Sequence, residues 1–259
     1  MADRLARNER TKRQMVSDVA HELRSPVTNL RCGLEAIQDG LVAPEPGRID
    51  GLHAETLLLQ RLITDLEDLS LAEAGGLSLV PAAVDVAAAV DRALGADTGG
   101  APVTISIDQV ARFVRADPDR LEQMLRNLIG NARRHTPPHG AIQVSATRRD
   151  AGVRIVVRDT GSAIAPVHLP HVFERFYRAD PSRTRATGGA GLGLAIVRRL
   201  AEAQGGSVTV DSEGEGKGST FTIQLGSPIP QADQSTSRRR TAPSQLSSPT
   251  RCRACRCSP

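Results

Sequence analysis

A histidine with charged neighbours stands near the start of the chain, in the segment MVSDVAHELRSPV at residues 15–27. One imidazole nitrogen of His21 can attack an electrophile if another group holds or accepts the proton of the other nitrogen, and Glu22 is the adjacent carboxylate. Arg24 follows within one helical turn. The pattern suits a nucleophile, although a solvated histidine on a helix surface is the favoured interpretation of this segment taken alone.

Two asparagines four residues apart stand in the segment NLIGNARRHT, residues 127–136. Asn127 and Asn131 share one face of a predicted helix, where two amide oxygens could meet a hard cation such as Mg²⁺. Arg134 and His135 follow at the end of that helix, within reach of a phosphate and a base. Asparagine pairs also occur on plain polar surfaces, so this segment alone is a weak signal.

A predicted strand ends at a carboxylate in the segment VVRDTGSAIAP, residues 156–166. Asp159 could accept a hydrogen bond from an exocyclic amine, and Gly161 would let the backbone approach a flat ligand closely. Ordinary turns use the same Asp-x-Gly pattern, so a simple turn is an equal alternative.

Glycines precede and open a predicted helix in the segment GGAGLGLAIVRRLAEAQGG, residues 188–206. The N–H groups at the start of a helix bind phosphate, and Gly189, Gly191 and Gly193 keep that end accessible. A dinucleotide-binding βαβ unit is excluded because a polar loop, not a strand, precedes the glycines. This loop follows a short aromatic helix predicted at 172–180. It is typical of a mobile lid that offers arginines to phosphate, namely Arg175, Arg178, Arg183 and Arg185.

Two long helices are predicted at the amino end, over about 4–40 and 49–74. Apolar residues recur every seven positions in both, at Val16, Leu23, Leu30 and Ile37 and at Leu52, Leu59 and Leu66. This repeat places His21 opposite the apolar seam. Two such helices joined by a short loop form an antiparallel hairpin that cannot bury its own stripe, so a homodimeric four-helix bundle is predicted.

From residue 77 the pattern changes to strands mixed with shorter helices. Asp117 and Pro118 are typical of an N-cap and a first helical residue. The mixture, without strict βαβ alternation, indicates an α+β sandwich with one layer of each. Strands are predicted at 77–80, 103–107, 141–146, 153–157, 207–210 and 220–225, and helices at 85–95, 118–134 and 191–204.

The net charge of +4 over 259 residues is unevenly distributed. Residues 229–259 hold six arginines and one aspartate, which leaves 27 basic and 28 acidic side chains elsewhere. A near-neutral body gives no electrostatic reason to bind nucleic acid. Cys32 is the one cysteine before this tail, so no disulfide framework is predicted, and no apolar run reaches the ~18–20 residues of a membrane span. A soluble cytoplasmic chain is expected.

In their order and spacing, these segments resemble the transmitter region of sensor histidine kinases of two-component systems. AHELRSPV is similar to the family's H-box, NLIGNARRHT to its N-box, DTGSAIAP to its first glycine box, VFERFYRAD to its F-box and GGAGLGL to its second glycine box. The resemblance covers residues 10–226. It implies a HisKA-type helical hairpin that forms a dimeric four-helix bundle, followed by a GHKL-type (Bergerat) two-layer α/β sandwich.

The resemblance implies that His21 is phosphorylated from ATP and then passes the phosphoryl group to an aspartate of a response regulator. Glu22 would be its acid–base partner, with Arg24 and Ser25 completing the catalytic set. Ser25 occupies a position that is often Thr or Asn in members with phosphatase activity, which leaves that activity open.

The resemblance also implies ATP and Mg²⁺ as cofactors. Asn131 would coordinate Mg²⁺ with support from Asn127, and Arg134 would contact phosphate. Asp159 would accept from the adenine amine, and Arg178 would contact the γ-phosphate. The full nucleotide-binding set is Asn127, Asn131, Arg134, His135, Asp159, Gly161, Arg178, Gly189, Gly191, Leu192 and Gly193.

The expected organisation is a dimerisation and phosphotransfer hairpin at 1–75, an ATP-binding domain at 76–228 and a disordered tail at 229–259. The expected partners are a second copy of the chain and the receiver domain of a response regulator. Because the chain begins about twenty residues before His21, without the sensor and membrane spans of typical members, two alternatives are open: a truncated or split kinase, or a signal that comes through a separate sensor or kinase subunit.

Two alternatives stay open from the sequence. Ala163 replaces the second glycine of the first glycine box, which would suit a degenerate kinase that dimerises and docks a response regulator without efficient ATP turnover. A GHKL ATPase of the mismatch-repair or chaperone type would share the nucleotide motifs but would not explain the H-box and hairpin. In the tail, Cys252, Cys255 and Cys257 lack a local fourth metal ligand, so disorder is favoured over a metal site.

Overall fold

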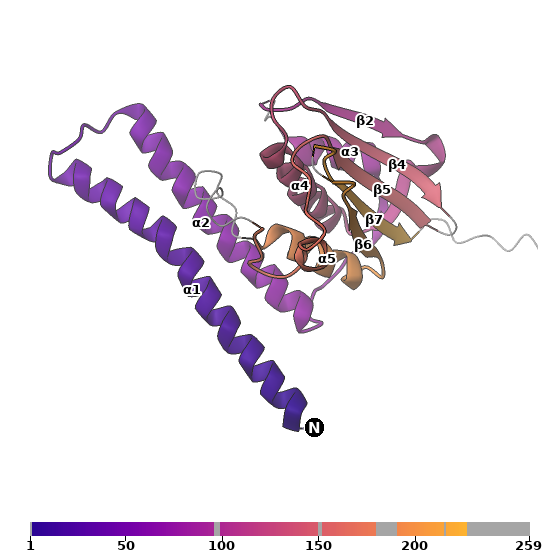
Figure 1. The fold of residues 1–259 in the computed structure, drawn as a ribbon, viewed down its shortest axis with the longest axis horizontal. Helices are drawn as coiled ribbons and strands as arrows, with labels where there is room; N and C mark the ends of the chain where they lie inside the picture. Colours follow the sequence, from indigo (N-terminus) through magenta and orange to yellow (C-terminus); the bar gives the residue numbers. More distant parts are fainter. Residues whose placement is uncertain (1, 96–98, 150–151, 180–190, 215, 227–259) are drawn as a thin grey trace, which may run out of the picture. The chain divides into compact units, whose positions relative to one another are not determined.

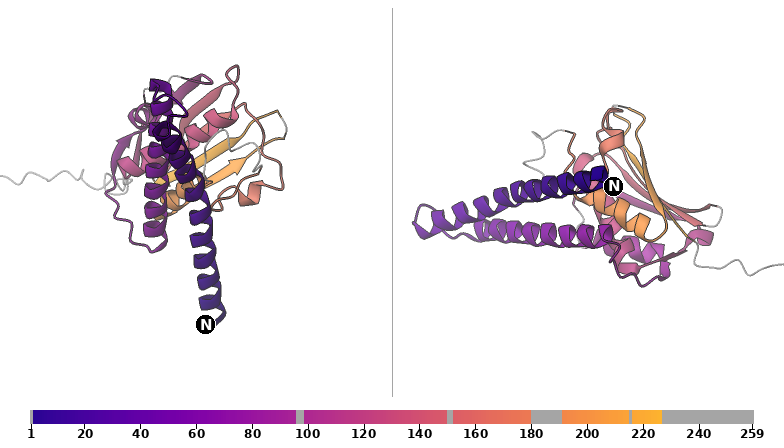
Figure 2. Two further views of the ribbon diagram at one scale, coloured as in Figure 1. Left: turned by 90° about the vertical axis from the view of Figure 1, so that its left-hand side faces the viewer. Right: turned by 90° about the horizontal axis from the view of Figure 1, so that it is seen from below.

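Two long helices open the fold of the computed structural model, which describes residues 2–95, 99–149, 152–179, 191–214 and 216–226. Helix α1 spans Ala2–Gln38 and helix α2 spans Pro46–Glu73. They lie side by side as an antiparallel hairpin (Figures 1 and 2). The seven-residue repeats predicted both helices, and α1 continues through Pro26.

A five-stranded mixed sheet forms the next layer, in the order β2-β4-β5-β7-β6. Strands β4, β5, β7 and β6 pair antiparallel, whereas β2 pairs parallel with β4. Strands β1 and β3 pair only with each other. The strands are β1 (Ala82–Asp85), β2 (Val103–Ile107), β3 (Phe113–Ala116), β4 (Ile142–Arg149), β5 (Gly152–Asp159), β6 (Ser207–Asp211) and β7 (Thr220–Gly226).

Three helices cover one face of this sheet, which confirms the predicted two-layer sandwich (Figure 1). They are α3 (Val86–Leu94), α4 (Pro118–His135) and α5 (Gly193–Ala203), with short 3₁₀ turns at Gln109–Ala111 and Leu169–His171. Within the part of the chain that the structure describes, no helix is both long and apolar enough to cross a membrane. The tail at 229–259 lies outside the described residues, as do its three cysteines.

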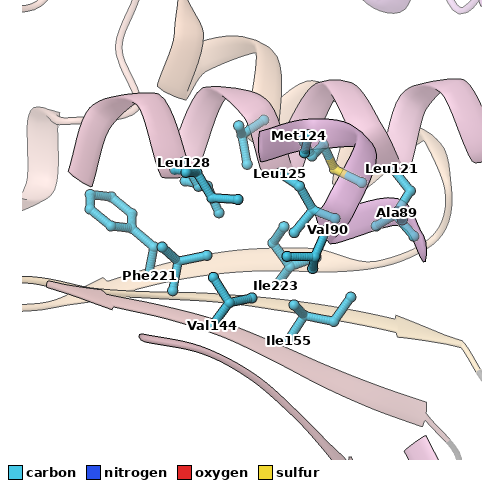
Figure 3. Close-up of a cluster of buried hydrophobic side chains, with 14 of the residues drawn as sticks. Ala89, Val90, Leu121, Met124, Leu125, Leu128, Val144, Ile155, Phe221 and Ile223 are labelled. Atoms are coloured by element: carbon cyan, nitrogen blue, oxygen red, sulfur yellow. The ribbon is translucent and has the colours of Figure 1, made fainter. Parts of the chain in front are cut away.

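The core of the sandwich lies between α4 and the sheet (Figure 3). Leu121, Leu125 and Leu128 recur at the helical period and are fully buried. They meet strand residues such as Val144 and Ile155, which alternate with less buried neighbours because successive strand side chains point to opposite faces. Burying each such leucine contributes about 1.5–3 kcal/mol, so this contact holds α4 in place.

Asp117 is the predicted N-cap of α4, and it also connects two other segments. Its Oδ1 accepts from the backbone N–H groups of Asp119 and Arg120, both at 3.1 Å. Its Oδ2 accepts from the Val80 N–H at 2.8 Å, and its own N–H donates to Gln204 Oε1 at 2.7 Å. The start of α4 is therefore joined to the segment that follows the hairpin and to the end of α5.

Three sequence predictions of local structure were wrong. Residues 77–80 form no strand, because the Val80 N–H is taken by Asp117 and Pro81 offers none, and pairing begins only at β1. The short strands β1 and β3 were missed, since they pair only with each other over four residues. The aromatic helix predicted at 172–180 does not form over 172–179, where the chain makes turns and bends instead, because Phe176 has φ 57°, outside the helical region.

We predict that Leu128→Ala lowers the free energy of unfolding by about 2–5 kcal/mol, because it leaves a cavity under α4. Val167→Ala, at a side chain that is 69% exposed, should change it by no more than about 0.5 kcal/mol. Chemical denaturation followed by circular dichroism measures both. Equal effects of the two variants would contradict the assignment of the core.

Candidate functional site

The two asparagines predicted on one helix face lie in the second half of α4, and both are half-buried. The Asn127 Nδ2 atom is buried without a hydrogen-bond partner, as expected of a group that meets a ligand. A Cβ added at Gly193 would lie 3.3 Å from Asn127 Oδ1, so the start of α5 packs directly on this asparagine. The first and last of the predicted nucleotide segments thus meet here.

Asp159 ends β5 as a buried carboxylate, with 2% of its surface exposed. Its Oδ1 accepts from the Gly161 N–H at 2.8 Å, and its own N–H donates to the Ser219 carbonyl at 2.9 Å. Burial raises the pKa of Asp159 above its ordinary value, while the Gly161 and Ser219 backbone and nearby His135 act in the opposite direction. Such a carboxylate can accept a hydrogen bond from a polar ligand group that replaces the lost water.

Gly161 joins the end of β5 to the end of α4. A Cβ at this position would overlap the His135 carbonyl, whose carbon would lie at 2.7 Å. The next residue, Ser162, donates its N–H to the same carbonyl at 3.1 Å. Only glycine fits here, because the turn after Asp159 packs directly against the end of α4, the helix that carries Asn127 and Asn131. This close packing sets the distance between Asp159 and α4.

Positive charge collects at the carboxyl end of α4. The pKa of the Arg134 guanidinium is lowered by desolvation and further by Arg61 of α2 and by Arg178. The pKa of His135 is also lowered, first by desolvation and then by Arg134, with Asp159 opposing. Three guanidiniums that repel one another form a site where an anion such as phosphate would be stabilised.

The aromatic segment and the last glycine segment are joined at Phe176 and Gly191. The Phe176 N–H donates to the Gly191 carbonyl at 3.0 Å. Gly191 has φ 70°, and a Cβ there would lie 2.8 Å from Phe176 Cα. Leu192, which is buried, then leads into α5, whose start has no side-chain cap and so presents backbone N–H groups. Gly189, Arg183 and Arg185 of the predicted lid lie outside the described residues.

The predicted nucleophile lies on α1, although the side chains of His21 and Glu22 are outside the described part. Arg24 and Ser25 are exposed on the same helix. An apolar cavity involves residues on either side of His21 together with two residues of the nucleotide segments. It is lined by Val19, Leu23, Leu62, Ile63, Leu66, Phe176 and Leu192.

A buried polar contact also links α2 to α4. Asp68, which is 7% exposed, accepts from Arg120 Nη1 and from Gln123 Nε2, both at 2.8 Å. Arg120 donates to Gln123 Oε1 at 2.9 Å, which closes the triangle. Nearby, burial raises the pKa of Asp65 from 3.8 to about 6, with Asp68 adding to this and Arg61 and Arg126 opposing it.

The sequence analysis missed two serines, Ser212 and Ser219, whose hydrogen bonds hold the segments next to Asp159. Ser219 supplies the carbonyl that holds the Asp159 backbone. Ser212 donates its hydroxyl to the Gly218 carbonyl at 2.8 Å and accepts from the Ile164 N–H at 3.0 Å. The signal was the Gly- and Ser-rich stretch between β6 and β7, which fits an ordinary hairpin turn equally well.

The alanine at the second glycine position carries no backbone strain. Among the described residues, Phe176 is the one non-glycine with positive φ, so Ala163 lies outside the left-handed region. Backbone strain at Ala163 therefore gives no reason to expect a degenerate kinase.

Comparison with known proteins agrees with this arrangement. Residues 11–75 match the model of the His Kinase A (phospho-acceptor) domain, and residues 116–229 match that of the histidine kinase-, DNA gyrase B-, and HSP90-like ATPases. The signal transduction histidine-protein kinase BaeS of Escherichia coli K12 is 37% identical over 231 residues, which are 87% of this chain and 49% of BaeS.

Two solved structures extend the likeness. The Acinetobacter baumannii histidine kinase AdeS has TM-score 0.67 and 29% identity, covering 80% of this chain and 97% of that one. The mycobacterial sensor histidine kinase MprB has TM-score 0.50 and 30% identity, covering 58% of this chain and all of that one.

The fold and site define a chain with a phosphoacceptor hairpin and a GHKL-type ATP-binding sandwich. The chain belongs to the sensor histidine kinases and represents their transmitter region. It spans about half the length, or less, of the curated relatives it matches.

We predict that affinity for ADP falls as the pH is lowered, earlier than an ordinary aspartate would allow. In the contact that the resemblance implies, the adenine amine donates to the ionised carboxylate of Asp159, whose raised pKa lets a proton compete at higher pH. Titration calorimetry between pH 8 and 5 measures the slope. Asp159→Asn should weaken binding and flatten the slope, and His135→Gln controls for the adjacent imidazole. An unchanged slope in Asp159→Asn would contradict the prediction.

Proposed function

We propose that this chain is an ATP-dependent protein-histidine autokinase of two-component signalling. The observation that carries the proposal is the meeting of four separate nucleotide segments on α4, in a chain whose α1 bears the H-box. In the reaction, a nitrogen of His21 forms a bond to the γ-phosphorus while the bond to the β–γ bridging oxygen breaks, and ADP leaves. The phosphoryl group then passes to an aspartate of a response regulator.

The residues of the sandwich bind and orient ATP as substrate. Asp159, which is buried, accepts from the adenine amine. Arg134 and Arg178 lie close enough together to share the charge of the phosphates. Catalysis of phosphoryl transfer depends chiefly on such positioning and charge neutralisation. Gly191 and Gly193 bring backbone N–H groups to the phosphates, and Gly189, the third glycine of the predicted phosphate loop, lies outside the described residues.

The residues present fit Mg²⁺ bound through the nucleotide. Asn131 offers an amide oxygen to the ion, and the buried, unpaired Nδ2 of Asn127 can donate to a phosphate oxygen beside it. Mg²⁺ typically keeps few protein ligands and several phosphate or water oxygens. When bound, the ion neutralises charge on the phosphates, and Asn131 would hold it with support from Asn127.

On the hairpin, Glu22 would hold the other imidazole proton of His21 and keep the attacking nitrogen unprotonated. Arg24 and Ser25, both exposed, lie where an incoming receiver domain would meet the phosphorylated histidine. We assign phosphotransfer to 1–75 and ATP binding to 76–228.

We propose a homodimer formed through the hairpin. An apolar stripe remains exposed on both helices, including Val27 and Leu34 of α1 and Ile49, Leu57 and Ile63 of α2. A contiguous exposed apolar stripe of this kind marks an interface. A second hairpin would bury it in a four-helix bundle.

Incubation with γ-labelled ATP and Mg²⁺ should give acid-labile, base-stable label on the chain. His21→Gln should abolish the label, while Cys32→Ser, also on α1, should retain it. Intact label in His21→Gln, or no label under any condition, would exclude the autokinase.

Light scattering at micromolar concentration should give about twice the 27.5 kDa of one chain. Leu34→Asp, which places a charge on a side chain that is 56% exposed in the stripe, should shift the mass to that of a monomer. Val110→Asp, at an exposed valine of the sandwich, is the matched control and should stay dimeric. A monomeric wild type would refute the homodimer.

A further inference from the structure

Tyr177 forms a side-chain hydrogen bond with His168, a residue outside the motifs described above. The Tyr177 hydroxyl and His168 Nδ1 share a hydrogen bond of 2.7 Å, in which the phenol donates when Nδ1 carries no proton. The ring also lies against His171, with centroids 5.4 Å apart. Both imidazoles come from the 3₁₀ turn at Leu169–His171 and its N-cap.

This contact lies beside a strained backbone. Phe176 has φ 57°, a conformation that is unfavourable for a non-glycine residue and persists only where the surroundings hold it. On one side, Phe176 is held by its N–H bond to Gly191. On the other side, the chain continues into Tyr177, whose side chain is half-buried.

The segment before this bend is fixed to the core. Phe173 meets Phe221 of β7 edge-to-face, with centroids 6.3 Å apart, and Val172 is buried. Val172 and Phe173 directly follow the 3₁₀ turn, so they anchor its carboxyl end to the core, and the Tyr177–His168 bond connects this anchored segment with the residues after Phe176.

Arg178 is the residue after Tyr177. Its guanidinium lies close enough to Arg134 to lower the pKa of that group, which places it at the phosphate end of the site. Any change in the direction of the backbone at Tyr177 therefore moves a cation relative to the γ-phosphate.

The geometry points to Tyr177 and His168 as a positioning pair for the autokinase: their hydrogen bond directs Arg178 toward the γ-phosphate of ATP. Neither side chain touches the nucleotide in this assignment. The inference rests on the proposed function, because it takes Arg178 to contact the γ-phosphate.

The test is the discrimination between ATP and ADP, since ADP lacks the phosphate that Arg178 meets. Tyr177→Phe keeps the ring and removes the hydroxyl. It should weaken binding of ATP and slow autophosphorylation by about threefold to tenfold, as expected for one lost hydrogen bond, and leave ADP affinity unchanged. Circular dichroism and thermal unfolding verify that the variant folds.

The acceptor side gives a second, independent measurement. His168→Ala should reproduce the loss, whereas His168→Asn, whose Oδ1 can take the place of Nδ1, should restore much of it. The double variant His168→Ala/Tyr177→Phe should be no worse than either single variant, because both remove the same bond. Glu174→Gln, which alters the His171–Glu174 contact but leaves Tyr177 and His168 intact, is the matched control.

Arg178→Gln distinguishes the role of the Tyr177–His168 pair from the contact of Arg178 with the γ-phosphate. If it abolishes the preference for ATP while Tyr177→Phe does not alter it, the positioning pair is overturned and the proposed site stands. If Arg178→Gln leaves the preference for ATP unchanged, both the pair and the role of Arg178 are overturned. Equal loss of ATP and ADP binding in Tyr177→Phe would show a merely structural contact and would also overturn the pair.

Discussion

The packing of α4 on the sheet is the constraint on which the rest of the site depends. One face of this helix is fully buried through residues such as Leu121, Leu125 and Leu128. Because a helix is a rigid rod with a fixed period, anchoring that face also fixes the direction in which Asn127 and Asn131 point. The other nucleotide segments then take their positions from α4: the end of β5 through the His135 carbonyl, and the start of α5 through Asn127.

The electrostatics of the site match the polarity of a nucleotide. A buried carboxylate, Asp159, stands where an amine-bearing base would bind, and guanidiniums gather where phosphates would follow. The lowered pKa of Arg134 reports desolvation and the repulsion among these cations in the free protein. A bound polyphosphate would relieve that repulsion without rearrangement of the site, which is how preorganised charge stabilises a transferring phosphoryl group.

The sequence predicted the long helices, the core helix and most strands because their apolar periods extend over many residues. It failed where one tertiary contact decides the backbone. Val80 does not join a strand because its N–H donates to the carboxylate of Asp117. Phe176 is not helical because its N–H donates to the Gly191 carbonyl. The order of the motifs along the chain was enough to name their residues. It did not predict which of these residues contact one another, because separation in the sequence does not determine distance in the folded chain. For the same reason the bond between His168 and Tyr177 had no sequence signal.

The two carboxylate oxygens of Asp117 have separate partners: one caps α4 and the other holds the Val80 N–H after the hairpin. Serine is as good an N-cap as aspartate in helices generally, but it has a single oxygen and cannot serve both segments. The residue type permitted at this position is therefore narrower than helix capping alone would allow. A substitution of Asp117 by another good N-cap residue would keep the helix but would remove the hydrogen bond that connects the phosphoacceptor hairpin with the ATP-binding domain.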